Sequence, residues 1–285
     1  MSSRRLQTLV ALMLAATWGA AVWIGHSNGY LRALDRIEST LTDLRTLARG
    51  VKAPPDRVTI VAIDDSMVKL GSTYPLARTD LASIIDAIAQ LNPKVIAVDL
   101  LLVDRGTADG DAALAKSFAT HPPVLAAAAI FSETSQPVTA DGDGPLVQLA
   151  KADRFLLPLQ MFAEHAEVGI ANVATTESGT PYAVPMLFRT NDKVELSLAL
   201  RVAAIAMGKP LTIEPNQLKF GDTAVSTDSD YTLPITYYGP RRTIRTVSAA
   251  SPADPPARRG ARPPPRRRRG EPIDRAGCRR RPPDA

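Results

Sequence analysis

Three aspartates could meet at one edge of an α/β sheet and do chemistry there. Asp64 and Asp65 directly follow the β-branched run "RVTIVAI", and Asp99 lies near the end of a second apolar run, "KVIAVDLLLV". In open α/β sheets, ligands bind outside the carboxyl ends of the strands, and clustered carboxylates are good ligands for Mg²⁺. One hypothesis is therefore a metal-dependent hydrolase that uses Asp64, Asp65 and Asp99.

A second interpretation gives the same aspartates a structural or ligand-shaping role. An aspartate at the end of a strand often caps the turn or helix that follows, and it can pair with a basic residue such as Arg78. The sequence favours this second interpretation, so no metal ligand is assigned.

Other acidic pairs and the familiar catalytic motifs give little support to an enzyme. Asp109 with Asp111, and Asp141 with Asp143, lie in glycine-containing loops that suggest calcium. The second pair lacks the terminal glutamate of an EF-hand loop, and Asp109 is better placed to cap a helix. The sequence has no GxSxG, Walker, HExxH or CxxC motif, and its only cysteine is Cys278. We therefore expect no catalytic residue, no metal and no cofactor.

The elements that would position these side chains alternate along the first half of the body. Runs of β-branched residues predict strands, and apolar residues at helical spacing, as in "RTDLASIIDAIAQLNP", predict helices. Thr79 or Asp80 could cap that helix, and Pro93 would end it. The expected order is strand 57–66, helix 78–93, strand 94–104, helix 109–121 and strand 123–131. This order is typical of a parallel sheet with right-handed crossovers.

The second half of the sequence predicts shorter elements and tighter turns. After a polar loop at 132–144 we expect a helix at 145–152, strands at 167–173 and 183–190, a helix at 194–208, a hairpin around Gly221 and Asp222, and a last strand at 231–239. Gly208 would close the longer helix. The predicted fold class is α/β: an open sheet with parallel βαβ units and a more antiparallel C-terminal part.

The N-terminal residues predict on which side of a membrane the body of the protein lies. Arg4 and Arg5 precede an uncharged stretch from Leu6 to Gly25, which is long enough to cross a bilayer as a helix, and Trp18 and Trp23 lie near its far end. Residues 1–28 are therefore predicted to be a cytoplasmic stub and one transmembrane helix, with the body outside the cytoplasm. The alternative is a signal peptide cleaved near residues 20 and 21, which would also export the body.

Residues 29–53 predict an amphipathic juxtamembrane helix. Pro54 and Pro55 end the helical pattern, and the body spans residues 54–250. A narrow apolar stripe fits either packing on the body or pairing with a second chain, in a homodimer through the N-terminal helices. The residues of this stripe recur at helical spacing: Leu31, Leu34, Ile37, Leu41, Leu44 and Leu47.

The last segment, 251–285, differs from the rest in composition. It holds eleven arginines, no lysine and four acids, so the positive net charge of the chain, +5, comes from this segment alone, while the rest of the chain is slightly acidic. Such a composition cannot build a core and is expected to be disordered. Because arginine, proline, alanine and glycine codons all have G or C in their first two positions, we interpret the segment as a frame-shifted reading of GC-rich sequence.

Four segments, in this order, resemble a known family. They are "DLRTLARG", "RVTIVAIDDSMVKLGSTYPLARTDLASIIDAIAQLNPKVIAVDLLLVD", "VGIANVATTESGTPYAVPMLFRTNDKVELSLALRVA" and "LPITYYGPRRTIRTVSAA". Over residues 30–250 the chain resembles a CHASE domain of the second type, a cyclases/histidine kinases associated sensory extracellular domain.

The resemblance implies the sensory input domain of a bacterial receptor. It would be held in the inner membrane by one N-terminal helix, with its body in the periplasm or outside the cell. In this family three more membrane helices and a cytoplasmic nucleotide cyclase or protein kinase normally follow, and the segment at 251–285 begins where they would start. The expected partners are the membrane and an unknown small-molecule or periplasmic cue, and not nucleic acid.

The resemblance also implies site residues. The family's acid pair after the first strand matches Asp64 and Asp65, its aspartate on the second strand matches Asp99, and the basic residue that heads the first helix matches Arg78. These four are the candidate ligand-binding residues. The family often has a tryptophan and a second proline before that arginine, whereas this chain reads "YPLA" at 74–77.

Overall fold

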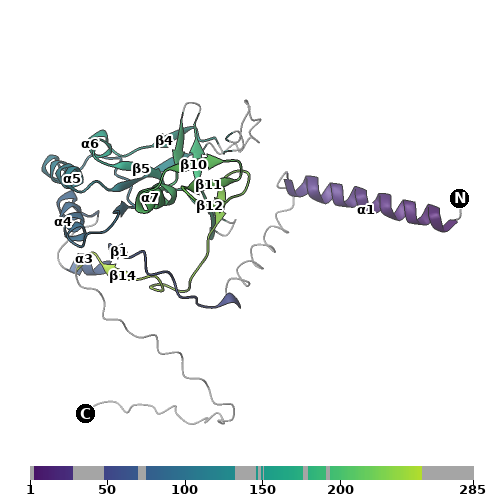
Figure 1. Ribbon diagram of the computed structural model, residues 1–285, viewed down its shortest axis with the longest axis horizontal. Coiled ribbons are helices and arrows are strands. Elements are labelled where there is room, and N and C mark those ends of the chain that lie inside the picture. Colours follow the sequence, from purple (N-terminus) through teal and green to yellow (C-terminus); the bar gives the residue numbers. More distant parts are fainter. Residues whose placement is uncertain are drawn as a thin grey trace, which may run out of the picture.

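The computed structural model describes residues 3–27, 48–69, 75–131, 146, 149, 151–175, 179–190 and 193–251. The body combines α-helices with strands that pair both in parallel and antiparallel, in several sheets (Figure 1). The predicted α/β class, with parallel and antiparallel pairing, is therefore confirmed.

The centre of the body is strand β3 (Val124–Ile130), which is buried along most of its length. It pairs in parallel with both β2 (Ala97–Val98) and β5 (Glu167–Ile170) through the same residues, so these two strands lie on its opposite edges. Strand β4 (Arg154–Leu156) runs antiparallel to the second half of β3. Helix α5 (Ala108–Thr120) connects β2 to β3 and completes the predicted βαβ unit.

Helix α4 (Arg78–Ala89) packs beside α5, and the short helix α6 (Gln160–Ala163) lies near them at the same side of the body (Figure 1). The rings of Phe118 and Phe162 meet edge to face, with their centroids 5.7 Å apart. Burying an aliphatic or aromatic side chain stabilises the fold by about 1.5–3 kcal/mol, so this cluster is a main source of its stability. Its buried members are Leu81, Ala82, Ile85, Val98, Leu102, Leu114, Phe118, Leu125 and Phe162.

The first predicted strand forms, but it does not join this sheet. β1 (Ile60–Ala62) pairs in parallel with β14 (Thr246–Ser248), with Ile60 opposite Thr246 and Ala62 opposite Ser248. The two strands form a separate two-stranded sheet. The prediction that β1 pairs within the same sheet as β2 and β3 is therefore wrong. The physical reason is that β14, which lies at the far end of the body in a stretch not predicted to be a strand, makes the hydrogen bonds along the edge of β1.

The C-terminal half consists of short antiparallel strands around helix α7 (Leu198–Met207). Three small sheets contain β6 (Ala174–Thr175), β7 (Pro181–Pro185) and β13 (Thr232–Pro234); β8 (Leu187–Arg189) and β9 (Val194–Leu196); and β10 (Leu211–Glu214), β11 (Gln217–Phe220) and β12 (Thr223–Ser226). The predicted hairpin is confirmed, since Gly221 and Asp222 join β11 to β12. Gly208 ends α7 in the left-handed conformation, with φ at 61°, as predicted.

The core of this half buries one tyrosine in an uncommon conformation. Tyr231 is fully buried and has φ at 59°, a left-handed value that a bulky side chain rarely adopts. Its hydroxyl has no hydrogen-bond partner in the described part of the chain, and burial raises the pKa of this phenol above 10.0, its ordinary value. The buried residues around it are Leu149, Met186, Leu187, Leu200, Leu218 and Phe220.

The predicted caps of two helices and the predicted start of a third are wrong. Helix α4 begins at Arg78 as predicted, but its N-cap is Ala77, which makes no side-chain bond, and not Thr79 or Asp80. Thr107 rather than Asp109 caps α5. The helix predicted at 194–208 begins only at Leu198, because the residues before it form β9 against β8.

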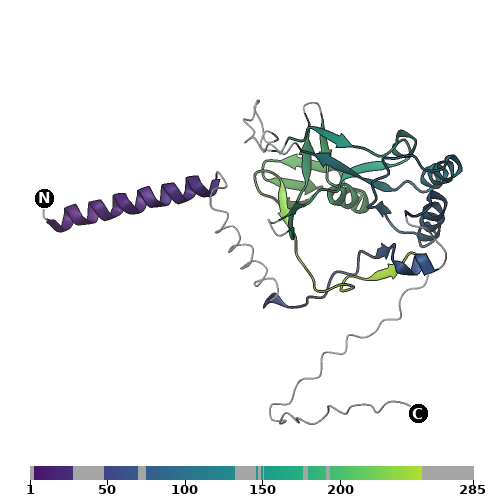
Figure 2. The same ribbon diagram turned by 180° about the vertical axis from the view of Figure 1, so that it is seen from behind.

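The N-terminal segment is helical. Helix α1 (Ser3–Ser27) has 25 residues and stands apart from the body (Figure 2). Its apolar side chains Leu12, Met13, Leu14 and Trp18 are exposed. No helix in the described part of the chain has the length and apolar character needed to cross a membrane, so the structure does not support the predicted transmembrane span.

Some predictions lie outside the described residues. These concern most of the amphipathic helix at 29–53, the polar loop at 132–144 with Asp141 and Asp143, most of the helix at 145–152 and the tail from residue 252. They stay predictions.

Candidate functional site

Asp64 lies where β1 gives way to helix α3 (Asp65–Lys69), and it caps that helix. Its Oδ1 atom accepts a hydrogen bond from the backbone N–H of Ser66 at 3.1 Å, and its carbonyl oxygen accepts one from the N–H of Met67 at 3.0 Å. Capping of this kind satisfies N–H groups that have no partner inside a helix. The structural role that the sequence favoured is therefore confirmed for Asp64.

The same carboxylate oxygen also reaches the far end of the body. The hydroxyl of Ser248, the last residue of β14, donates a hydrogen bond to Asp64 Oδ1 at 2.7 Å. This bond, with smaller contributions from Ser66 and the positive charge of Arg242, lowers the pKa of Asp64 against the opposing effect of desolvation. Asp64 is thus held as a carboxylate that ties the first strand to the last.

The other two aspartates do not complete a metal site. Asp65 is exposed at the start of α3, and Asp99 is exposed directly after β2, in a different sheet from β1. Within the described ranges, no group of three or more His, Cys, Asp or Glu side chains could hold a metal ion. The hypothesis of a metal-dependent hydrolase built on Asp64, Asp65 and Asp99 is therefore not supported, because β1 pairs with β14 and not with β2.

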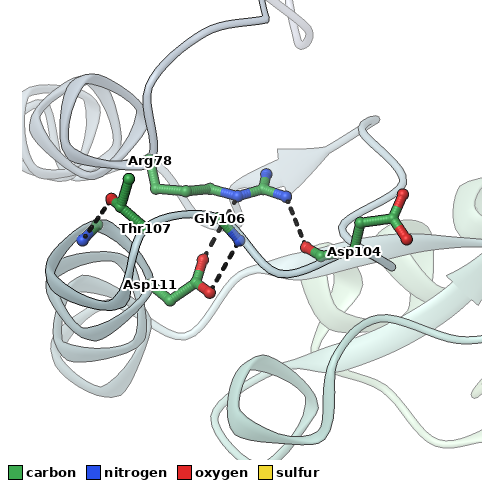
Figure 3. Close-up of polar contacts among 6 residues, drawn as sticks. Arg78, Asp104, Gly106, Thr107 and Asp111 are labelled. Atoms are coloured by element: carbon green, nitrogen blue, oxygen red, sulfur yellow. Dashed lines mark hydrogen bonds and ion pairs between the residues drawn. The ribbon is translucent and has the colours of Figure 1, made fainter.

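Arg78 joins two helices and a loop (Figure 3). It is the first residue of α4, and its side chain extends over the loop before α5, so that the guanidinium lies beside Asp104. Nη2 donates to the carbonyl oxygen of Asp104 at 3.3 Å, and Nε lies 3.7 Å from Oδ1 of Asp111. The guanidinium carbon also lies 5.9 Å from the ring centroid of Phe162, within range of a cation–π interaction.

Asp111 is the residue that sequence reasoning missed as the partner of Arg78. Its side chain is only 6% exposed, and Oδ2 accepts the backbone N–H of Gly106 at 3.0 Å. The positive charge beside this carboxylate is therefore the guanidinium of Arg78. The available signal was its position in the first turn of a helix, where the helix dipole favours a negative charge.

The loop around this pair is tightly packed. Thr107 Oγ1 accepts the N–H of Gly110 at 3.2 Å and caps α5 (Figure 3). A Cβ added at Gly106 would lie 3.0 Å from both Cγ of Arg78 and Oδ1 of Asp111. A larger residue at position 106 would therefore crowd the side chains of Arg78 and Asp111. We call Arg78, Asp104, Gly106, Thr107 and Asp111 the Arg78 cluster.

Helix α4 connects the Arg78 cluster to the contact between Asp64 and Ser248. Leu76, just before the helix, packs against both the main core cluster and a smaller cluster that contains Met67, Ile84 and Ala249. Met67 belongs to α3 and Ala249 directly follows β14. The candidate residues Asp64 and Arg78 are therefore linked through packed side chains, although they make no direct contact among those the structure describes.

The Arg78 cluster can bind charge, but it lacks the parts of a catalytic site. The Arg78 side chain is 20% exposed, so its guanidinium can bind an anionic group from solvent, in competition with the nearly buried carboxylate of Asp111. Within the part of the chain described here, no nucleophile hydrogen-bonded to a basic side chain accompanies them. Such an arrangement suits recognition of a ligand more than bond cleavage.

Of the comparisons with known proteins, the one with family models finds a match. The family model described as CHASE2 domain matches residues 11–267, a longer stretch than the resemblance over residues 30–250. No curated protein and no solved structure matches the chain. Since the match extends over most of the 285 residues, from α1 past the last strand of the body, the chain belongs to the CHASE2 domain family.

Proposed function

We propose that this chain is the extracytoplasmic input domain of a bacterial signal-transduction receptor, and that its cue acts at the Arg78 cluster. CHASE2 domains are sensory extracellular domains and are not catalytic. The observation that carries the proposal is the position of α4. This helix has Arg78 at its start and packs through Ile84 beside Ala249, next to the strand by which the chain leaves the body.

A sensor must bind its ligand more tightly in one conformation than in another, and the Arg78 cluster supplies contacts that would differ between two such conformations. A ligand shifts a conformational equilibrium only if it binds one state more tightly than the other. An anionic group that reaches Arg78 would compete with Asp111 for the guanidinium, so its binding would loosen the contact between the loop at 104–107 and α4. The ion pair, at 3.7 Å, is long enough to leave the guanidinium partly available.

A change at Arg78 has a short path to the end of the body. Displacement of α4 would move Ile84 against Met67 and Ala249, and these residues lie beside the pairing of β1 with β14. Asp65 and Asp99 remain candidate ligand-binding residues, and their exposed carboxylates support that role. The expected output partner is a cytoplasmic nucleotide cyclase or protein kinase.

Attachment to the inner membrane is a separate part of the proposal. The exposed apolar side chains along α1 support attachment, as do the exposed rings of Trp18 and Trp23, since such rings favour the membrane interface. Alkaline extraction of membranes from expressing cells should leave the full chain in the pellet. A soluble chain that starts near residue 21 would instead identify α1 as a cleaved signal peptide. A homodimer through the N-terminal helices stays a prediction.

Hydrogen exchange tests whether the Arg78 cluster is coupled to the end of the body. In the full chain, Arg78→Ala should speed amide exchange in the loop at 104–107 and also at Thr246, Val247 and Ser248. Arg105→Ala is the matched control, because it removes an exposed arginine of the same loop. Faster exchange confined to 104–111 would contradict the coupling.

A second measurement separates a sensor from the hydrolase. The full chain should not hydrolyse p-nitrophenyl phosphate or bis-p-nitrophenyl phosphate with added Mg²⁺. If turnover were observed and Asp64→Asn abolished it, the proposed function would be wrong.

A further inference from the structure

Two segments far apart in sequence run side by side along the base of the body. Residues 48–60 enter the body and residues 235–248 leave it, next to each other in both ribbon views (Figures 1 and 2). The N–H of Lys52 donates to the carbonyl oxygen of Tyr238 at 2.8 Å, and the N–H of Ile60 donates to that of Arg245 at 2.9 Å. The pairing of β1 with β14 continues this contact.

Their side chains give this base a strong positive charge. Asp56 is the only acid in residues 48–60 and 235–248, and none of the cations forms an ion pair with another residue of the described part. Arg242 lies near Asp64, since its positive charge contributes to the lowered pKa of that residue, and Asp56 precedes Arg57 in the sequence. We call this surface the basal basic surface, formed by the exposed residues Arg49, Lys52, Arg57, Arg241, Arg242 and Arg245.

Exposed apolar side chains lie among these charges. Val51 is 70% exposed, Val58 is 60% exposed and Tyr237 is 43% exposed. All three belong to the same two segments as the cations. A surface that serves only to keep a protein in solution has no need of exposed apolar groups between unpaired cations, whereas a lipid headgroup region accepts both kinds.

We propose that the basal basic surface binds the anionic phospholipid headgroups of a membrane. The six cations would face the phosphates, and Val51, Val58 and Tyr237 would enter the headgroup layer. Each basic residue near an anionic membrane strengthens binding by roughly fivefold. The proposal goes beyond membrane attachment through α1, because it orients the body with both of its chain connections at the lipid surface.

This docking would place the pairing of β1 with β14 at the membrane. Arg241, Arg242 and Arg245 lie just before β14, and Arg57 lies just before β1. A movement of this strand pair would therefore change how the cations contact the lipid. The inference rests on the proposed attachment to a membrane but does not depend on the Arg78 cluster, so the two can fail separately.

The test uses the full chain with one fluorescent label. Cys278→Ser removes the only cysteine, and Thr236→Cys places a polarity-sensitive dye at an exposed position on the base. Vesicles of phosphatidylcholine are compared with vesicles of equal parts phosphatidylcholine and phosphatidylglycerol. The dye should shift to a less polar environment only in the vesicles with phosphatidylglycerol, and raised salt should reverse the shift. A dye at Glu164→Cys, in the residue after α6, should not shift.

Two triple variants decide whether the basal basic surface is responsible. Arg241→Gln, Arg242→Gln and Arg245→Gln together should weaken docking on the order of a hundredfold. Lys151→Gln, Arg154→Gln and Lys209→Gln remove the same charge from exposed positions elsewhere and should leave docking unchanged.

Both variants keep α1 and the arginines of 251–285, so neither segment can account for a difference between them. Equal weakening in the two variants, or an equal shift in neutral vesicles, would overturn the proposal.

Discussion

The hydroxyl of Ser248 donates a 2.7 Å hydrogen bond to Oδ1 of Asp64, and this bond ties the last strand of the body to the first. The two residues are 184 positions apart and meet because β1 and β14 pair in parallel. The same oxygen accepts the N–H of Ser66 at the start of α3. One carboxylate therefore fixes the end of β1, the start of α3 and the position of β14.

Replacing Ser248 should change the pH dependence of stability. The pKa of Asp64 is lowered in the folded state, mainly by Ser248, so its contribution is present above the ordinary value of 3.8 and is lost as the pH falls through the lower folded value. Ser248→Ala should therefore lower the free energy of unfolding at pH 7, and the difference from the wild type should shrink at acid pH. Urea titrations over this pH range measure it.

Ser83→Ala is the matched control for this experiment. Ser83 is an exposed serine of α4 whose hydroxyl donates to the carbonyl oxygen of Thr79. Its loss should have the same effect at every pH. A pH-independent effect of Ser248→Ala would show that the hydroxyl does not act through Asp64.

Gly169→Ala should destabilise the body strongly. A Cβ added at Gly169, in β5, would lie 2.5 Å from Cα and 2.8 Å from N of Leu198, so the backbone at the start of α7 would have to move. Overpacking of this kind costs about 1–3 kcal/mol, and a clash with backbone belongs at the upper end. Gly19→Ala is the control, because an added Cβ there meets nothing within 4 Å. Denaturant unfolding that was unchanged in Gly169→Ala would contradict this close approach of α7 to β5.

Arg78 and Asp111 should be energetically coupled despite their long separation. Both are mostly buried, and removing one leaves the other without its opposite charge. A double-mutant cycle with Arg78→Met and Asp111→Asn should give a coupling of about 1 kcal/mol.

Lys219 and Glu214 provide the contrast, since their 2.7 Å pair is shorter but more than a third exposed. Their cycle should give about 0.5 kcal/mol or less. A larger coupling for the exposed pair would mean that distance rather than burial sets the strength of these pairs.

Local patterns predicted the elements well where neighbours in sequence decide the structure. Strand β3, helix α5, the turn at Gly221 and the end of α7 at Gly208 all follow from apolar periodicity or from the conformations that glycine allows. The N-cap of α4 was misjudged because Ala77 begins the helix without a side-chain bond. Such a start leaves no mark in the sequence.

Pairings between distant residues could not be predicted in the same way. Nothing local to Thr246, Val247 and Ser248 shows that they pair with β1 rather than end as a loop, and this pairing separates Asp64 from Asp99. The sequence identified Arg78 and Asp64 as candidates but expected Arg78 to pair with an aspartate at the end of a strand, whereas its partner is Asp111 in a helix. Asp111 became its partner only through the crossing of α4 over the loop before α5, which is a tertiary contact.

Tyr231→Phe should stabilise the protein and change its behaviour at high pH. The hydroxyl is buried without a partner among the described residues, so removing it should raise the free energy of unfolding by about 1 kcal/mol. Burial raises the pKa of Tyr231 above 10.0, so the unfolded chain releases this proton more readily and the wild type loses stability as the pH rises past 10.0. The phenylalanine variant should lose less stability over the same pH range.

Tyr237→Phe, which removes a hydroxyl that donates to the carbonyl oxygen of Pro181 at 2.6 Å, should destabilise the protein instead. Unfolding titrations at neutral and alkaline pH distinguish these outcomes, and a destabilised Tyr231→Phe variant would mean that the hydroxyl has a hydrogen-bond partner after all.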